Sequence, residues 1–333
     1  MYRFPARRRE QADIAIDLGT AHTRVVERGG GISFDQPSLC CFADDGIRPK
    51  LIAVGDAASA MNERTSGALA VRRPLARGVL QDIDAARELL RCAVRSSTGR
   101  RRFAAPRALI GVPADATQAE RRALHTAAAD AGIRHVRLAR EPLLAALGAA
   151  LPIADATGSL IVECGAGTTE VGVFSLGGFC LARSARGGGN ALDKAIAGYI
   201  NAQHHFLIGD RTAERLKRAL VDCLPADDPD QRTVEIKGRS ISDRKPGMLV
   251  LRAAEFGPVV AKHTSQIAEL VRAVLSETPP QLSDDIYDNG VVLTGGSAFG
   301  LLAGAISAAT GLRAVIADDN EHCVTRGLAE MLG

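Results

Sequence analysis

The stretch Ser159-Leu-Ile-Val-Glu-Cys-Gly-Ala-Gly-Thr-Thr-Glu-Val-Gly-Val-Phe-Ser175 predicts a β-hairpin whose turn can hold an anion. Residues 160–162 and 171–174 are apolar and strand-like, and a Gly/Thr-rich turn joins them. Glycine lets backbone N–H groups approach a phosphate closely, and threonine adds hydroxyl donors. An acid just before such a turn can hold a hydrated divalent cation against the phosphates. In this stretch the acid is Glu163, and the turn comprises Gly165, Ala166, Gly167, Thr168 and Thr169.

The same pattern occurs near the start of the chain, as Ile14-Ala-Ile-Asp-Leu-Gly-Thr-Ala-His-Thr-Arg-Val-Val26. Two copies predict an internal duplication, in which two similar domains each offer one hairpin to a nucleotide bound in the cleft between them. We expect a tail at 1–12, a first domain at 13–150 with a small outgrowth at about 32–80, and a second domain at 151–333 with an outgrowth at about 187–257. The acid of the first copy is Asp17, and its turn comprises Gly19, Thr20, Ala21 and His22.

Other phosphate-binding motifs do not fit the pattern. A Rossmann loop is followed by a helix, whereas this turn is followed by a strand. A P-loop needs a Gly-Lys pair, and the chain contains none. The remaining structural alternative is a plain β-hairpin with a Gly-rich turn.

The length and composition of the chain limit which classes of protein it can belong to. With 333 residues, 46% hydrophobic and 24% charged, the chain is long enough for two globular domains. Its 41 basic and 38 acidic residues are too balanced to favour nucleic acid as a partner. Seven cysteines without a C-x-x-C pair suggest neither a zinc site nor a disulfide framework. No signal peptide or membrane-spanning run is evident, so we expect a cytoplasmic protein.

One exposed loop has two interpretations. Within residues 96–105, Phe103 directly follows Arg100, Arg101 and Arg102. The segment is either a solvated loop or a contact with an anionic membrane surface, where arginine and an aromatic side chain act together.

Glu141 also has two interpretations. It precedes Pro142 at the start of a predicted helix, where an acid stabilises the helix N-terminus. Alternatively, it faces the cleft between the hairpins and orients a water molecule at the terminal phosphate.

Two later segments are candidates for the base and sugar. The strand at 290–294 runs into a glycine pair and then a helix; a flat ring can lie on such bare backbone, and a helix N-terminus favours phosphate. In the predicted helix at 209–219, Glu214 and Lys217 lie one turn apart on one face, as most solvated surface pairs do. The residues of the glycine turn are Gly295, Gly296, Ser297 and Ala298.

The order of these motifs resembles the superfamily of actins, sugar kinases and heat-shock chaperones, and most closely the bacterial actins of the MreB and Mbl family. The resemblance covers nearly the whole chain. It rests on Ile16-Asp-Leu-Gly-Thr-Ala-His-Thr23, Glu141-Pro-Leu-Leu-Ala-Ala-Leu-Gly148, Gly209-Asp-Arg-Thr-Ala-Glu-Arg-Leu-Lys217 and Leu293-Thr-Gly-Gly296.

This resemblance implies an α/β actin-like fold of two duplicated domains, each with a mixed sheet and a small subdomain, and ATP with Mg²⁺ in the cleft. It further implies filaments of the protein itself, peripheral on the inner face of the cytoplasmic membrane, that work with membrane proteins of cell-wall synthesis to direct cell shape. Asp17 and Glu163 would hold the metal through water, Glu214 and Lys217 would contact the adenosine, and Glu141 would hold the hydrolytic position.

The chain departs from the family pattern at the second hairpin. The family usually has Asp-x-Gly-Gly-Gly-Thr-Thr, and this chain has Glu163-Cys-Gly-Ala-Gly-Thr-Thr169. His22 also stands where the family usually has Asn, and Ser297 where it has Gly. We therefore expect ATP binding with slow hydrolysis. A nucleotide-locked scaffold that assembles without turnover stays open. A sugar kinase would need a larger insertion and a catalytic acid, and a chaperone would need a separate substrate-binding domain.

Overall fold

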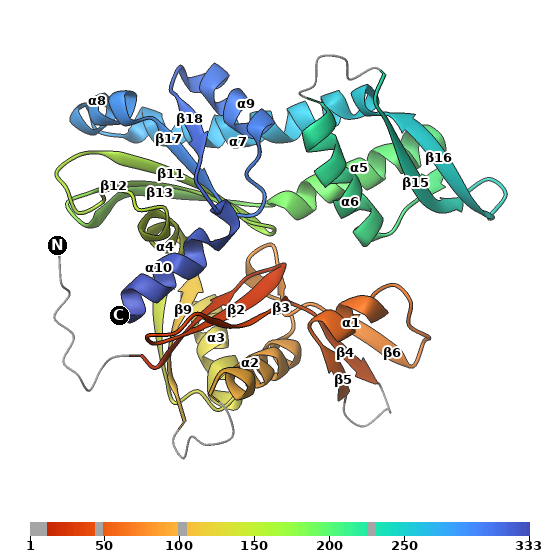
Figure 1. The fold of residues 1–333 in the computed structure, drawn as a ribbon, viewed down its shortest axis with the longest axis horizontal. Coiled ribbons are helices and arrows are strands. Elements are labelled where there is room, and N and C mark those ends of the chain that lie inside the picture. Colours follow the sequence, from red (N-terminus) through yellow and green to blue (C-terminus); the bar gives the residue numbers. More distant parts are fainter. Residues whose placement is uncertain (1–11, 44–48, 99–104, 225–230) are drawn as a thin grey trace.

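The computed structural model describes residues 12–43, 49–98, 105–224 and 231–333. Two five-stranded mixed sheets form its two halves, with smaller sheets beside them (Figure 1). In the first sheet, with order β10-β9-β1-β2-β3, β1 pairs antiparallel with β2 and parallel with β9. Its strands are β1 (Ile14–Leu18), β2 (His22–Glu27), β3 (Ile32–Pro37), β9 (Arg107–Val112) and β10 (His135–Arg140).

The second sheet repeats this topology. Its order is β13-β12-β11-β17-β18, and its central strand again pairs antiparallel with the next strand of the sequence and parallel with a strand that follows later. The repeat confirms the duplicated α/β fold expected from the two hairpins, whereas the domain boundaries stay a prediction. The strands are β11 (Ser159–Cys164), β12 (Thr168–Ser175), β13 (Gly178–Arg186), β17 (Val291–Thr294) and β18 (Ala314–Ile316).

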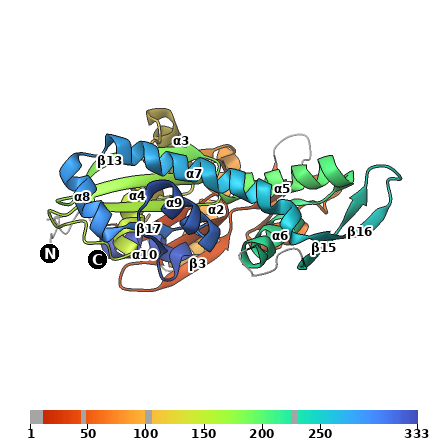
Figure 2. The same ribbon diagram turned by 90° about the horizontal axis from the view of Figure 1, so that it is seen from above.

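Helices pack against both sheets. In the first half, α2 (Ile83–Thr98) and α3 (Gln118–Asp130) bury their apolar faces against the sheet. The spacing of Thr117-Gln-Ala-Glu120 predicts a capping box at the start of α3. The structure confirms it, because the Thr117 hydroxyl accepts from the Glu120 N–H and the Glu120 carboxylate accepts from the Thr117 N–H. In the second half, α7 runs along the sheet toward the smaller sheet beside it (Figure 2). The helices there are α7 (Gly257–Glu277), α8 (Pro280–Asn289) and α9 (Gly300–Thr310).

Two helices join the halves. α4 (Glu141–Gly148) and α10 (Cys323–Leu332) lie between the two sheets and cross at Gly148 and Gly327 (Figure 1). A Cβ at Gly148 would lie 1.8 Å from the Cys323 carbonyl oxygen, so only glycine allows this approach. The core around the crossing combines residues from both halves, among them Leu144, Ile161 and Leu328.

The smaller sheets form the outgrowths. The sequence of residues 32–42 predicts one short strand. The structure divides it at Ser38 and Leu39, so that β3 stays in the first sheet and β4 enters a small one. The cause is the buried Ser38, whose N–H donates to Ala21 O and whose hydroxyl donates to Gly19 O, tying the chain to the first hairpin turn. The first outgrowth contains β4 (Cys40–Ala43), β5 (Lys50–Val54), α1 (Asp56–Met61) and β6 (Leu69–Arg72), followed by β7 (Leu75–Ala76) and β8 (Val79–Leu80).

The second outgrowth is larger. Its three-stranded sheet has the order β14-β15-β16, and its core includes Phe206, Leu216 and Ile236. Across the described ranges, no helix is both long and apolar enough to span a bilayer. The elements of this outgrowth are α5 (Gly189–His204), β14 (Phe206–Leu207), α6 (Asp210–Cys223), β15 (Thr233–Ser240), β16 (Pro246–Arg252) and η1 (Ala253–Phe256), and a last short turn, η2 (Asn320–His322), precedes α10.

Candidate functional site between the two hairpins

The turns of the two hairpins meet directly. A Cβ at Gly167 would lie 2.3 Å from the Thr20 hydroxyl oxygen and 2.8 Å from the Gly78 nitrogen. The Gly78 N–H in turn faces the Thr20 hydroxyl at 3.4 Å. Glycine at position 167 therefore allows the second turn to touch the first.

Backbone donors of both turns are left available. In the second turn, the carbonyl oxygens of residues 165–167 accept hydrogen bonds from the chain that leads into α5. The N–H groups of Gly19 and Gly165 close the two turns by donating to the carbonyls of His22 and Thr168, whereas four further turn N–H groups have no acceptor among the described residues. Such converging N–H groups form a concavity that favours an anion. These donors are the amides of Thr20, Ala21, Ala166 and Gly167.

Several residues predicted to bind adenosine converge at the start of α5. A Cβ at Gly189 would lie 2.2 Å from the Ser297 hydroxyl oxygen and 3.1 Å from Lys217 Nζ. Lys217 also forms an ion pair of 3.0 Å with Asp193. Glu214 is exposed instead and pairs with Arg218 of its own helix. The structure thus brings Lys217 and Ser297 together, while Glu214 lies at the surface.

The glycine turn after β17 packs on the end of β11. Gly295 has a φ of +87°, and a Cβ there would lie 2.3 Å from the Cys164 carbonyl oxygen. The same oxygen accepts the Ser297 N–H at 2.9 Å. This contact fixes the turn of Gly295, Gly296, Ser297 and Ala298 beside the second hairpin.

Three carboxylates form a cluster behind the second turn. Glu141, Glu163 and Glu170 each place one oxygen within 4.8 Å of the others. Glu141 is the first residue of α4, so it occupies the helix N-terminus and faces the hairpin acid at the same time. Glu170 was missed by the sequence reasoning; the available signal was an acid that directly precedes the apolar run of β12.

Burial sets the protonation of this cluster. It raises the pKa of Glu163 and of Glu141 well above the usual value, and the neighbouring acids add to the effect. Burial also raises the pKa of Glu170 to about 7, although the Ala114 N–H donates to one of its oxygens at 2.8 Å. Two unit charges 4.8 Å apart repel each other by about 3.5 kcal/mol at an effective dielectric constant of 20. The cluster therefore favours a bound cation or protons.

Asp17, the acid of the first hairpin, has a positive neighbour as well as a buried position. Asp17 lies opposite Arg24 in the hairpin register, and its Oδ2 accepts from the Thr325 hydroxyl of α10 at 3.1 Å. Burial raises its pKa, and Arg24 opposes that shift. The donor set at this cleft fits Mg²⁺, because it consists of carboxylate oxygens and Glu163 Oε2 has no hydrogen-bond partner within the described part of the chain.

Arg186 joins the two halves beside the turns. Its guanidinium pairs with Asp115 at 3.0 Å and donates to the Arg77 carbonyl at 3.1 Å. Arg77 donates to the Arg186 carbonyl in return, at 3.3 Å. The partners are far apart in the sequence, so no local pattern indicated this contact.

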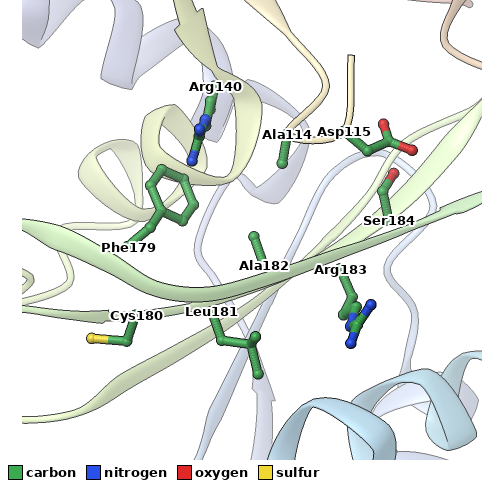
Figure 3. Close-up of a pocket in the computed structure, with 9 residues that line it drawn as sticks. All are labelled: Ala114, Asp115, Arg140, Phe179, Cys180, Leu181, Ala182, Arg183 and Ser184. Carbon is green, nitrogen blue, oxygen red and sulfur yellow. The ribbon is translucent and has the colours of Figure 1, made fainter. Parts of the chain in front are cut away.

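A pocket of about 330 Å³ is lined by Ala114, which donates to Glu170, and by Ser184, the cross-strand neighbour of Glu170. Figure 3 shows Arg140 close to Phe179 at one side and Asp115 facing Ser184 at the other. Arg140 lies over the Phe179 ring at 5.0 Å. None of the residues predicted from the sequence lines this pocket, which is bounded by Ala114, Asp115, Arg140, Phe179, Cys180, Leu181, Ala182, Arg183 and Ser184.

Two predictions concern residues outside the hairpin turns and the carboxylate cluster. His22 is exposed, and its Nδ1 lies 3.1 Å from Asp35, so its side chain is held by the neighbouring strand. The predicted membrane residues Arg100, Arg101, Arg102 and Phe103 lie outside the described residues.

Two sheets of one topology, whose Gly/Thr hairpin turns meet each other, define an actin-like protein. MreB5 of Spiroplasma citri bound to AMPPNP has this fold, with a TM-score of 0.87, 31% identity, and coverage of 96% of this chain and 95% of that chain. The chain belongs to the MreB/Mbl family, because residues 11–333 match the model for MreB/Mbl protein.

Curated relatives agree with this membership. The cell shape-determining protein MreB of Escherichia coli strain K12 is 38% identical over 319 residues, which are 95% of this chain and 91% of that protein. The cell shape-determining protein Mbl of Bacillus subtilis strain 168 is 33% identical over 323 residues, or 96% and 95%. The MamK double helical filament, at 23% identity and a TM-score of 0.76, supports the fold alone.

Proposed function

We propose that this chain is a bacterial actin that binds ATP with Mg²⁺ between its two hairpins and assembles into filaments. The observation that carries the proposal is the meeting of the two turns at Gly167, where four backbone amides have no partner among the described residues. The MreB5 relative has been solved with AMPPNP and with ADP, which supports a nucleotide in the equivalent cleft.

Each group of the cleft then has a role. The four turn amides bind the phosphates, while Lys217, Ser297 and the turn at Gly295 and Gly296 position the nucleoside. Asp17 and Glu163 would hold Mg²⁺ through water, and the cation would neutralise charge at the phosphates. Glu141 orients the attacking water and accepts its proton, a role that fits its place at the start of α4 beside the hairpin acid.

The cellular role follows from the relatives. Both named relatives are cell shape-determining proteins, and we propose the same role for this chain. Its filaments would lie on the inner face of the cytoplasmic membrane and organise membrane proteins of wall synthesis. A nucleotide-locked scaffold is the alternative, favoured by Glu163 in place of the usual Asp.

High-speed sedimentation tests assembly. The purified chain is compared with ATP and Mg²⁺, with ADP, without nucleotide, and with ATP plus a chelator. We expect pelleted protein with ATP and Mg²⁺ and much less without nucleotide. Equal amounts in all four pellets, or none in any, would contradict nucleotide-dependent assembly.

We propose membrane contact through Arg100, Arg101, Arg102 and Phe103. Each basic residue near an anionic surface contributes about 1 kcal/mol, and polymerisation multiplies weak contacts. In a liposome pelleting assay, the variant Arg100→Ser, Arg101→Ser, Phe103→Ser should bind anionic vesicles clearly less than the parent. Equal sedimentation of both would remove this loop from the membrane contact.

Replacing Glu163 by Asp should speed phosphate release. The extra methylene of Glu moves the carboxylate by about 1.5 Å. Mg²⁺ tolerates displaced ligands poorly, and a misplacement of this order costs up to about a hundredfold in rate. We therefore expect release by Glu163→Asp to be about tenfold to a hundredfold faster under assembling conditions. Glu235→Asp, at an exposed strand position, is the control. A Glu163→Asp rate no higher than that of the parent would show that this side chain does not limit turnover.

A further inference from the structure

A contact between the two outgrowths lies apart from the hairpins, at the first turn of α6. The carboxylate of Glu63, which follows α1, accepts the Asp210 N–H with both of its oxygens, at 3.2 and 3.1 Å. Arg73 adds an ion pair of 3.7 Å to the Asp210 carboxylate. Figure 1 shows α1 and α6 on the facing sides of their outgrowths. Two residues that are 147 positions apart in the sequence therefore connect the two halves.

Glu63 takes the place of a local cap at the N-terminus of α6. The N-cap residue is Gly209, which has no side chain that could accept the first N–H groups of the helix. Its φ of −82° suits any residue, so the backbone there does not require glycine. A Cβ at Gly209 would lie 2.3 Å from Glu63 Oε2, which occupies the space where a local cap would begin. The cap of this helix thus comes from the other half of the molecule, as a negative charge that the positive helix end attracts.

The backbone of Glu63 has a conformation that glutamate rarely adopts. Its φ is +59°, in the left-handed region, which costs energy for a residue with a Cβ. Such conformations persist where surrounding contacts hold them in place, and they concentrate at clamps and switches. At Glu63 the contact that accompanies the strained backbone is the one with α6. The conformation and the contact together indicate a role beyond the local turn.

Helix α6 connects this contact to the proposed nucleotide site. Lys217 lies about two helical turns after Asp210, and therefore on the same side of the helix. Its Nζ donates to the Gly189 carbonyl at 3.4 Å, at the start of α5, where we propose that the nucleoside binds. Leu216 and Leu220 fix α6 in the core of the second outgrowth, so the helix moves with that outgrowth. Separation of α6 from Glu63 would therefore move Lys217 relative to the first half.

We propose that Glu63 is a positioning residue, which latches the two outgrowths together and thereby slows release of the nucleotide. This inference rests on the proposed function, in which the nucleotide binds between the two halves. While the Glu63 carboxylate holds the Asp210 N–H, the outgrowths stay together and Lys217 stays at the nucleoside. When this contact opens, the outgrowths separate and the nucleotide leaves. Glu63 acts through α6, and not through the nucleotide itself.

Three variants separate the latch from the backbone around it. Glu63→Gln keeps the size of the side chain and removes its charge. Glu63→Gly removes the side chain and relieves the positive φ. Arg244→Gly is the matched control, because Arg244 has a φ of +58° and is exposed. It lies in the turn between β15 and β16, which projects from the second outgrowth (Figure 1). The control thus makes the same backbone change away from the latch.

The rate of nucleotide release measures the latch. Each chain is loaded with fluorescently labelled ATP and Mg²⁺, and the label is then chased with excess ATP. Both Glu63 variants should release the label about twofold to fivefold faster than the parent, the factor that corresponds to losing an acid at an exposed helix N-terminus. Arg244→Gly should release it at the parental rate. A purely local role of Glu63 would change the unfolding temperature alone. Release at the parental rate from both Glu63 variants would overturn the proposal.

Hydrogen–deuterium exchange of the nucleotide-free chain tests the latch without ATP. Glu63 binds the Asp210 N–H, so the start of α6 should exchange faster in both Glu63 variants than in the parent. Arg244→Gly should exchange there like the parent. Unchanged exchange at the start of α6 would overturn the latch even if the nucleotide binds as proposed. If the parent bound no labelled ATP, the proposed function would fail, and the exchange would still decide whether Glu63 holds α6.

Discussion

Replacing Gly167 by valine is expected to abolish ATP binding. Even the first carbon of the new side chain would lie 2.3 Å from the Thr20 hydroxyl and 2.8 Å from the Gly78 nitrogen, so one turn must move away. The displaced turns can then no longer direct their amides at the same phosphates. We expect the dissociation constant for labelled ATP to rise by about a hundredfold or more, which corresponds to about 2.8 kcal/mol.

Gly31→Val is the matched control for this change. Gly31 also lies in a hairpin connection, has no positive φ, and has open space where a Cβ would be placed. The control should bind ATP like the parent and unfold at a similar temperature. Unchanged ATP binding by a folded Gly167→Val chain would show that the nucleotide does not lie between these turns.

Replacing Glu141 by glutamine should stop turnover while leaving nucleotide binding nearly intact. Glutamine keeps the size of the side chain but cannot accept the proton of the attacking water. General-base catalysis contributes about 10²–10⁴ in rate, so phosphate release should fall by about that factor. Binding of ATP should change little, because the interaction lost is one made in the transition state.

The experiment compares steady phosphate release with labelled-ATP binding in one set of variants. Glu330→Gln, at an exposed position of α10, is the control and should behave like the parent. Equal phosphate release by Glu141→Gln and the parent would remove Glu141 from the reaction. If the parent itself releases no phosphate, the nucleotide-locked scaffold becomes the better account.

The fold was predictable because its decisive features are local in the sequence. An acid between an apolar strand and a Gly/Thr turn occurs twice, and the two five-stranded sheets repeat one topology around those copies. The capping box at Thr117 and Glu120 was predictable for the same reason, since both partners lie within one helical turn.

Features that depend on the tertiary arrangement were not predictable. Glu170 belongs to the site because the register of β11 and β12 sets it beside Glu163, and a single sequence does not specify this register. Arg186 reaches Asp115 and Arg77 across the boundary between the halves. The break between β3 and β4 arises from hydrogen bonds of Ser38 to the first turn, which no local signal indicated.

The sequence indicated the place of some site residues better than that of others. The turn residues and Glu141 converge because each follows a strand of one sheet or the other, and such strand ends are recognisable from the sequence. Glu214 and Lys217 lie on one helix, yet Lys217 pairs with Asp193 and Glu214 pairs with Arg218. Their shared face alone could not distinguish a buried partner from an exposed one.

Negative-stain electron microscopy of the purified chain with ATP, Mg²⁺ and anionic vesicles tests the central claim most directly. The proposed function predicts filaments lying on the vesicle surface with ATP, and none with Gly167→Val or without nucleotide. Dispersed particles under every condition, or the same filaments with Gly167→Val, would contradict a nucleotide-dependent bacterial actin.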